Sequence, residues 1–517
     1  MLRRSFFASL ILLSTSAAHA ADIPVDPSNY LNVLPSLQPG DRLMLAGGTY
    51  TQGLPITNLN GTDAAWITIM GPASGPAATF EGNPCCNTVE LVNSSYVAVE
   101  HITVDGKGID GVFGVSAKNG ASNVVHHVRI EGCTLIGQNA SQQTVGISTK
   151  TPTYGWIIRG NVIDGAGTGM YLGNSNYADP FVGGIIEYNL IRNTIGYNLQ
   201  IKNQNAWPAH PALPNEMAPR TILRHNVFVK DDTPSPDGDR PNVFLGGPPP
   251  TGVGSGAVIE AYGNLFVHNP RESLMQATGR VSIHDNIFVD ASDVAVLLGP
   301  HDGFALLGAR VYDNTFYVAK RAVALSAQPA EGDLATGNLV FAEMAFDGPF
   351  VGLGTNLVDT AANAATYVNK PSIMLGDMDL YPLAGKVETM PIDPGAFAGD
   401  TDFGCDFNGD PRKTFTHRGA YANTGTNPGW KLANERKPEV VCQQSSGAGG
   451  GGSSSSTSGS GSSSSGSGEG GAGGMGGGGS DGETTGSCGC RTVTSSSNTS
   501  MVFLFGAVAL AISRRRR

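Results

Sequence analysis

Three lysine side chains follow the same short motif and are expected to lie in one line on the folded surface. Lys118, Lys150 and Lys202 each end a five-residue phrase that begins with glycine or asparagine and continues with an apolar residue. Like charges side by side on adjacent strands cost stability, so a purely structural origin explains such a line poorly. A row of ammonium groups instead suits the carboxylates of an acidic polymer. The alternative is that the lysines are solvated surface residues without a role.

Lys202 is the candidate for chemistry because aromatic and polar residues gather around it in the sequence. A lysine can act as a general base when burial or neighbouring charge lowers its pKa toward neutrality. We interpret Lys202 as the base, with His210 or His225 as the acid. Aromatic rings and amides can contact the faces and hydroxyl groups of sugars. The candidate substrate-binding residues are Lys118, Lys150, Tyr171, Gln200 and Trp207.

The lysine phrases alternate between inward and outward positions, as short β-strands do. Alternation places an apolar set inside the protein, namely Val115, Ile147, Met170, Leu199 and Val243. It places a second set outside, namely Ser116, Ser148, Tyr171, Gln200 and Phe244. Two irregular, proline-rich stretches, 203–220 and 231–255, interrupt the pattern beside Lys202. Loops inserted in successive repeats wall a groove, so we expect the site between these two stretches.

A second phrase, two or three apolar residues ending in asparagine, recurs between residues 97 and 340 at intervals of 22 to 38 residues. This period, built from short alternating runs, predicts a β-solenoid whose coils stack on one another. One residue per coil then forms a column, and stacked asparagines can pass amide hydrogen bonds along it. The predicted ladder contains Asn161, Asn189, Asn226, Asn264, Asn286 and Asn314.

An outward column of alternating charge is expected beside this ladder. It contains Glu131, Arg159, Glu187 and Arg224, and it is expected to continue through Glu260 and His284. Opposite charges on adjacent strands attract, so we interpret this column as structural ion pairs.

The repeat resembles that of right-handed parallel β-helix proteins of the pectate-lyase-like superfamily, over residues 38–425. Residues 40–50 are similar to the first-coil signature of such proteins, and residues 66–71 to the coil that follows. The resemblance implies an all-β fold, a single right-handed parallel β-helix. In related polysaccharide lyases a basic residue removes the proton next to a uronate carboxylate, which calcium or arginine neutralises. Residues 201–204 and 223–226 echo the catalytic motifs of these lyases only in part.

Other chemistry is also open. The glycosidases of this fold use clustered aspartates, and Asp231-Asp232 is the acidic pair near the expected groove. The spacing of Asp406, Asn408 and Asp410 suggests a calcium loop, but no carboxylate stands at loop position 12, which favours a structural turn. The cofactor is therefore unknown, calcium is possible, and no thiol-bound metal is expected because a Cys-x-x-Cys pattern is absent.

The two ends of the chain carry targeting signals. Residues 1–20 are typical of a secretory signal peptide. Residues 21–444 are expected to form one β-helix domain with caps, beginning with a short helix within residues 26–37, and 445–487 a flexible Gly/Ser-rich linker. Residues 488–517, with Cys488 and Cys490, an apolar stretch and terminal arginines, resemble the MYXO-CTERM sorting domain. This resemblance implies a disordered tail and a cysteine anchor at the outer cell surface, associated with the outer membrane.

The remaining cysteines fit an exported protein. Cys405 and Cys442 are expected to form a disulfide that pins the C-terminal cap, and Cys133 to pack as a buried free thiol. Cys85 and Cys86 either pair with each other or stay reduced. The net charge of −11 disfavours binding to nucleic acid.

Two functions from different classes remain open. The first is a secreted, surface-displayed monomer that binds or modifies polysaccharide, with uronate lyase as the favoured chemistry. The second is a noncatalytic adhesin or structural surface protein.

Overall fold

The computed structural model describes residues 20–84, 87–120 and 123–442. These residues belong to one compact unit. The predicted signal peptide up to His19, the Cys85-Cys86 pair, the linker, and the tail with Cys488 and Cys490 lie outside the described residues. Within the described ranges, none of the helices has the length and apolar character needed to cross a membrane.

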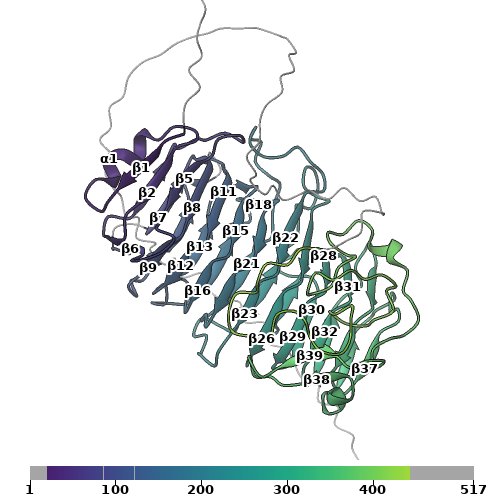
Figure 1. Ribbon diagram of the computed structural model, residues 1–517. Coiled ribbons are helices and arrows are strands. Elements are labelled where there is room, and N and C mark those ends of the chain that lie inside the picture. The colour runs from purple at the N-terminus through teal and green to yellow at the C-terminus, as the bar shows by residue number, and fades with distance from the viewer. Residues whose placement is uncertain (1–19, 85–86, 121–122, 443–517) are drawn as a thin grey trace, which may run out of the picture. The chain divides into compact units, whose positions relative to one another are not determined.

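The chain winds into the predicted right-handed parallel β-helix, whose coils contribute strands to three long sheets (Figure 1). Sheet A contains β1 (Asp22–Val25), β2 (Arg42–Leu45), β5 (Ile67–Met70), β8 (Ser95–Glu100), β11 (Val125–Glu131), β15 (Ile157–Arg159), β19 (Ile185–Glu187), β22 (Arg220–Arg224), β25 (Val258–Tyr262), β28 (Gly279–His284), β31 (Leu306–Tyr312) and β34 (Asp333–Thr336). In addition, β14 (Thr153–Tyr154) pairs with β11, and β18 (Phe181–Val182) pairs with β14.

Sheet B follows sheet A in each coil after a short turn. It contains β3 (Gly48–Tyr50), β6 (Ala78–Glu81), β9 (Ile102–Asp105), β12 (Thr134–Ile136), β16 (Val162–Asp164), β20 (Leu190–Arg192), β23 (Val227–Val229), β26 (Leu265–Asn269), β29 (Ile287–Ala291), β32 (Thr315–Tyr317), β35 (Leu339–Phe341) and β37 (Leu357–Asp359).

Sheet C completes the coil, and longer loops connect it to sheets B and A. It contains β4 (Leu54–Thr57), β7 (Val89–Val92), β10 (Val115–Ala117), β13 (Val145–Thr149), β17 (Thr168–Leu172), β21 (Leu199–Ile201), β24 (Val243–Leu245), β27 (Met275–Ala277), β30 (Val294–Leu298), β33 (Arg321–Leu325) and β36 (Met344–Asp347). Here the predicted inward set is confirmed, whereas four of the five residues predicted outside, Ser116, Ser148, Gln200 and Phe244, are also buried because loops cover this face. The inward residues align from strand to strand and are fully or almost fully buried, as Val115, Ile147, Met170, Leu199 and Val243 show.

The predicted asparagine ladder is present at the turn from sheet A to sheet B. The amide nitrogen of each asparagine donates to the side-chain oxygen of the next, at 2.9–3.0 Å, from Asn161 through Asn189, Asn226, Asn264, Asn286 and Asn314. The ladder continues through Asn338, the weakest of the predicted repeats, and extends one coil beyond it to Asn356. Because each amide also donates to a backbone carbonyl, the ladder satisfies buried polar groups at this turn, for example at Ile130.

The predicted charge column is correct in its first half and wrong at Glu260. Arg159 Nη1 lies 2.8 Å from Glu187 Oε1, and Arg224 Nε lies 2.7 Å from Glu187 Oε2. The next position along the column is Tyr262, followed by His284. Glu260 stands two residues before Tyr262 in a parallel column, where it pairs with Arg220, because a two-residue shift keeps a side chain on the same face.

A short helical segment closes the first coil, as predicted. Helix α1 (Tyr30–Val33) continues into the 3-10 helix η1 (Leu34–Ser36), and Tyr30 and Leu34 enter the core. The Tyr30 hydroxyl donates to the carbonyl of Gly53 at 2.6 Å. The preceding strand β1 pairs with β2, which the sequence pattern did not predict.

The coils end with β37, earlier than the expected end near residue 440. The chain then forms η3 (Ala361–Thr366), the antiparallel pair β38 (Val368–Lys370) and β39 (Asp379–Pro382), and η4 (Pro394–Phe397), and returns across the outer surface of the coils (Figure 1). Its apolar side chains pack on the outward residues of sheet B. The predicted Cys405–Cys442 disulfide joins two parts of this C-terminal segment, and Cys133 is a buried free thiol, as predicted.

Candidate functional site

The predicted lysine line lies at the ends of sheet C strands, and each of its members has a partner. Lys118, Lys150 and Lys202 directly follow residues that align with one another, with Gly173 between the last two. The Lys118 ammonium forms an ion pair with Glu90 at 2.5 Å. The Lys150 ammonium lies 4.4 Å from the centroid of the Phe113 ring. These contacts offset part of the repulsion between the lysines, which was the reason to doubt a structural role for the line.

Lys202 differs from the other two lysines in its burial. Only 9% of the residue is exposed, and its ammonium lies 5.6 Å from the Tyr171 ring centroid and 5.2 Å from the Tyr177 ring centroid. Burial lowers the pKa of Lys202. A Cβ at Gly173 would lie 2.9 Å from the Lys202 Cβ, so the glycine on the adjacent strand gives this side chain its space.

Loops bring further groups to Lys202 from distant parts of the sequence. The Tyr177 hydroxyl donates to Asp302 Oδ2 at 2.8 Å, and His301 Nδ1 lies 3.3 Å from the same oxygen. The charges of Asp302 and Arg240 both act on Lys202. Burial raises the pKa of Tyr177 to about 12, with Asp302 as a further cause. We define the Lys202 site as Lys202, Tyr171, Tyr177, Tyr197, Arg240, His301 and Asp302.

Loop 299–304, between sheets C and A, forms one wall of the site. The side chain of Asn203 contacts it, because the side-chain amide nitrogen donates to the His301 carbonyl at 3.4 Å. The His301 ring packs 4.5 Å from the Phe244 ring, and the Phe304 ring lies 5.3 Å from that of Tyr177. These contacts hold the loop against strands several coils before its own.

Loop 230–242, between sheets B and C, forms the opposite wall. The Lys230 ammonium donates to the Gly196 carbonyl at 2.8 Å, and burial lowers the pKa of Lys230 to about 8. Gln142 donates to the Gly238 carbonyl at 2.9 Å. The Arg240 guanidinium carbon lies 5.8 Å from the Tyr197 ring centroid. The predicted long stretch 231–255 is thus two loops at opposite edges of sheet C, separated by β24.

The structure separates several predicted site residues from Lys202. His225 is buried at the turn from sheet A to sheet B, where its ring stacks on that of Tyr188. His210 Nδ1 accepts the backbone N–H of Ala212 at 3.1 Å, and its charge acts on His126 of sheet A. No contact among the described residues holds either histidine beside Lys202. Both stand after Lys202 in the sequence, His210 within the irregular loop that follows it and His225 after the next complete strand, β22. His301 is the histidine that the fold places beside Lys202.

Trp207 and Gln200 have mainly local contacts. The Trp207 indole donates to Gln204 Oε1 at 2.8 Å, and a Cβ at Gly254 would lie 2.2 Å from its ring. Trp207 thus packs two long loops together, and a sugar could reach only what remains of its surface. Gln200 aligns with Tyr171 on the outer face of sheet C, where only 4% of it is exposed.

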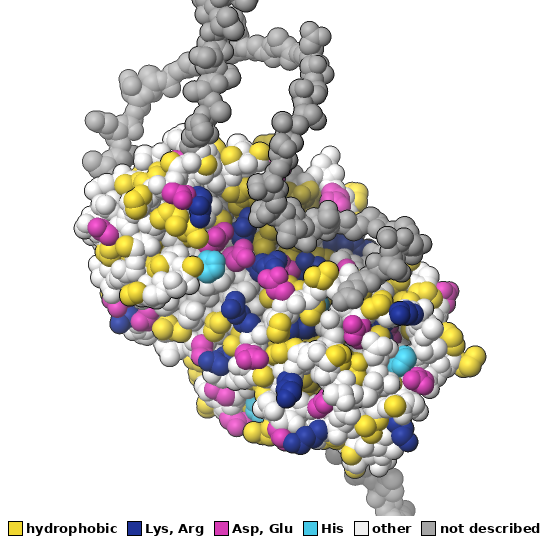
Figure 2. Space-filling model, viewed as in Figure 1, with side chains coloured by type: hydrophobic (Ala, Val, Ile, Leu, Met, Phe, Trp, Pro, Cys, Tyr) yellow, Lys and Arg dark blue, Asp and Glu magenta, His cyan; other side chains and the backbone are white. Residues whose placement is uncertain are grey.

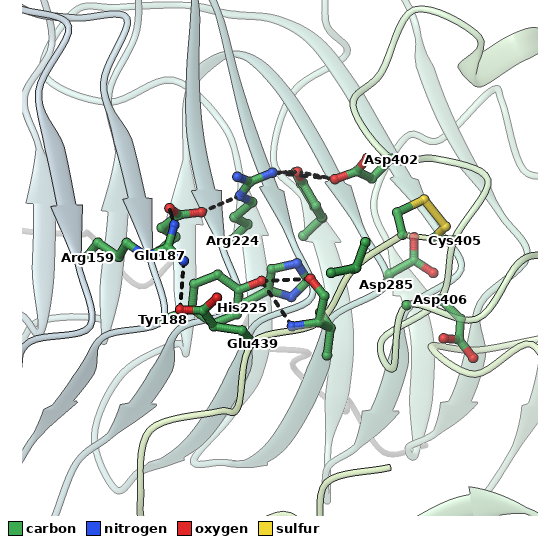
Figure 3. Close-up of a pocket in the computed structure, with 15 residues that line it drawn as sticks. Arg159, Glu187, Tyr188, Arg224, His225, Asp285, Asp402, Cys405, Asp406 and Glu439 are labelled. Carbon is green, nitrogen blue, oxygen red and sulfur yellow. Dashed lines mark hydrogen bonds and ion pairs between the residues drawn. A yellow bond between two sulfur atoms is a disulfide. The ribbon is translucent and has the colours of Figure 1, made fainter. Parts of the chain in front are cut away.

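A cleft of about 330 Å³ lies on sheet A beneath the C-terminal segment (Figure 3). Both arginines of the cleft are already taken up in ion pairs, since Arg159 bridges Glu187 and Glu439 and Arg224 bridges Glu187 and Asp402. Near the cleft, the ammonium of the buried Lys437 donates to three acceptors, His225 Nδ1 at 3.1 Å and the carbonyls of Gly263 at 2.9 Å and Phe407 at 2.6 Å. These contacts fasten the C-terminal segment to the coils. Figure 2 likewise shows basic and acidic side chains interspersed over the visible face rather than gathered in one patch.

The residues of the suggested calcium loop do not fit a cation. Asp406 Oδ1 accepts the backbone N–H groups of Asn408 and Asp410, both at 2.8 Å, and Oδ2 accepts that of Ala422 at 2.7 Å. This is the alternative structural turn. Among the described residues, no group of three or more His, Cys, Asp and Glu side chains is arranged to hold a metal ion. Of the Asp231-Asp232 pair, Asp232 lies 3.3 Å from His268 on sheet B, away from Lys202.

The Lys202 site therefore combines a lysine of lowered pKa, a fixed cation and tyrosine hydroxyls across one sheet face. Arg240 and Tyr197 approach from the loops before the sheet C strands, and Lys202, Tyr177 and Asp302 from the loops after them. This arrangement can hold an anionic group at Arg240 while Lys202 exchanges a proton.

Comparisons with known proteins relate the chain to solved structures of low sequence identity. No protein-family model and no curated protein matches the chain. An alginate lyase from Paenibacillus sp. str. FPU-7 is 14% identical, with 66% of this chain and 99% of that chain covered and a TM-score of 0.38. Pectate lyase Pel9A is 12% identical, with 81% and 96% covered and a TM-score of 0.40. A GH136 lacto-N-biosidase from Eubacterium ramulus is 14% identical, with 63% and 68% covered and a TM-score of 0.40. At these identities the likeness concerns the fold alone.

Proposed function

We propose that the outer face of sheet C binds an acidic polysaccharide and that Lys202 catalyses its β-elimination. The observation that carries this proposal is the position of Lys202, which is nearly buried between two tyrosine rings with its pKa lowered. A solvated lysine stays protonated at neutral pH and cannot accept a proton, whereas a desolvated one can. Burial lowers the pKa of Lys150 as well, but Lys150 keeps more of its surface exposed and its ammonium lies over a single ring, that of Phe113.

The roles in the reaction follow from charge and position. Arg240 would pair with the uronate carboxylate and so make the neighbouring C–H more acidic. Neutral Lys202 would take that proton, and the electron pair would form the double bond as the C–O bond to the leaving sugar breaks. Tyr171, whose pKa is raised by burial, holds its proton at neutral pH and would donate it to the leaving oxygen. Lys118 and Lys150 would contact carboxylates of adjoining sugars.

The test uses the full-length chain and a panel of uronate polysaccharides, with absorbance of the unsaturated product as the readout. Lys202→Met keeps the apolar stem of the side chain and removes the amine, so product formation is expected to stop while the thermal midpoint stays within a few degrees. Lys118→Met is the matched control and is expected to weaken binding with product formation retained. No product from the wild-type chain on any polymer, or a fully active Lys202→Met variant, would refute the lyase.

A noncatalytic binding module is the second candidate function. The observation in its favour is that Lys118, Lys150 and Lys202 all have partners within the protein. In that case the panel would yield glycan binding without unsaturated product, and Lys202→Met would change binding alone.

We also propose that the chain is exported and displayed at the outer cell surface as a monomer. The signal-like residues 1–20 and the tail at 488–517 support this proposal. Mass spectrometry of surface-released protein is expected to show a mature form that ends near Cys488 or Cys490. A mature form that still contains Arg517 would contradict the sorting role.

A further inference from the structure

Asp302 contacts several members of the Lys202 site at once. We propose that it is a positioning residue, whose hydrogen bond holds the Tyr177 ring beside Lys202 and whose carboxylate favours the ammonium form of this lysine. The inference rests on the proposed function in one respect, namely that the proton exchanged at Lys202 belongs to the substrate. The positioning itself is a property of the free protein and can be measured without substrate.

Asp302 lies close to two side chains of the Lys202 site, Tyr177 and His301. Its Oδ2 accepts the Tyr177 hydroxyl at 2.8 Å and lies 3.3 Å from His301 Nδ1. Tyr177 stands 125 residues before Asp302 in the sequence, whereas His301 is the direct neighbour of Asp302 on loop 299–304. The Tyr177 backbone is in the left-handed region, at φ +63°, which a tyrosine adopts only when its surroundings hold it.

The backbone at Tyr177 and at the residue before it is also held by hydrogen bonds. The Tyr177 carbonyl accepts the backbone N–H of Asn205 at 2.8 Å, and the Asn205 amide donates to the Asn176 carbonyl at 3.1 Å. The turn before Tyr177 is thus fixed to the segment that follows Lys202. The hydroxyl bond to Asp302 then fixes the far end of the ring, so that the ring stays beside the ammonium.

The titratable and charged groups around Lys202 come from every wall of the site. The strand below contributes Tyr171, loop 173–180 contributes Tyr177, and the turn before β21 contributes Tyr197. Loop 230–242 contributes Arg240, and loop 299–304 contributes His301 and Asp302. Among the charges that act on Lys202 in the described part of the chain, Asp302 is the negative one and Arg240 the positive one.

The two charges oppose each other in their effect on the lysine. The carboxylate of Asp302 favours the ammonium and raises the pKa of Lys202, whereas Arg240 and burial lower it. Asp302→Asn keeps an oxygen that can accept the Tyr177 hydroxyl and removes the charge. Asp302→Ala removes both. Arg240→Met removes the opposing charge, so its effect on the lysine is expected to have the opposite sign.

The experiment measures the pH dependence of Lys202 acetylation in the full-length chain, by isotopic labelling and mass spectrometry without polysaccharide. We expect the midpoint for Lys202 to fall in Asp302→Asn and to rise in Arg240→Met. Asp302→Ala is expected to lower the midpoint and also to increase the labelling rate at high pH several-fold, because Tyr177 is released. Lys118, whose partner is Glu90, is the internal control and should keep its midpoint in each variant.

Two results would overturn the inference. One is a Lys202 midpoint that is the same in Asp302→Asn and the wild-type chain. The other is an equal labelling rate at high pH in Asp302→Ala and Asp302→Asn, which would mean that Asp302 does not hold Tyr177. Failure of the proposed lyase appears separately, as absence of unsaturated product from the wild-type chain, and leaves the labelling result as it stands.

Discussion

Removal of one amide from the middle of the asparagine ladder should cost much more stability than removal of one at its end. Asn226 is fully buried, and its side-chain nitrogen donates to Asn264 Oδ1, to the Ile186 carbonyl and to the Arg224 carbonyl, at 2.9–3.0 Å. Its side-chain oxygen accepts two hydrogen bonds from Asn189, at 2.9 and 3.0 Å. Asn226→Ala therefore leaves two buried donors of Asn189 without an acceptor.

The magnitude follows from the cost of unsatisfied buried groups. Each stranded donor costs about 1–3 kcal/mol, so we expect the two to remove about 2–6 kcal/mol from the free energy of unfolding. Asn356 makes similar bonds, to Asn338 and to the Ala335 carbonyl, but it is partly exposed at the last coil. Water can replace the missing amide there, and Asn356→Ala should cost only about 1 kcal/mol.

Denaturant unfolding followed by circular dichroism measures the difference. The comparison needs equal slopes for both variants, because a solenoid can unfold in parts and then no single free energy applies. A loss for Asn226→Ala no greater than that for Asn356→Ala would show that the ladder aligns the coils without contributing a large share of their stability.

Two further predictions concern the disulfide of the C-terminal segment and a buried carboxyl group of the coils, that of Asp313. Cys405 and Cys442 are 37 residues apart, so in the chain-entropy model their disulfide contributes about 4 kcal/mol to the stability of the folded state. In Cys442→Ser we expect faster amide hydrogen exchange within residues 402–442. Unchanged exchange in these residues would contradict this prediction. Burial raises the pKa of Asp313 above its ordinary 3.8, which means that the folded state binds this proton more tightly. The stability due to Asp313 is thus present at low pH and lost as the pH rises through the raised pKa. In Asp313→Asn the thermal midpoint should therefore fall less over that pH range. An identical pH profile in the variant and the wild-type chain would refute the assignment.

The repeat is the part of this fold that sequence reasoning predicted best. Each coil passes the same corner once, so the asparagines recur at one place in the pattern and stack in the structure. The extent of the C-terminal segment was not predicted, although a signal existed. Strands such as 227–229, 265–267 and 287–289 are apolar at consecutive positions, which is typical of strands buried on both faces. The segment after Asp359 provides the second cover.

The sequence by itself determined which coils stack and that Lys202 ends a sheet C strand, because both are set by a local period of apolar and polar residues. It could not determine which residues face Lys202. The residues that face it stand in loops that do not repeat, namely Asp302, His301, Arg240 and Tyr177. Their sequence positions do not indicate which neighbouring coils each loop packs against. Only packing decides that, since the loops settle where their rings and hydrogen bonds meet partners from other coils. The same packing buries Lys202, and burial changes its chemistry.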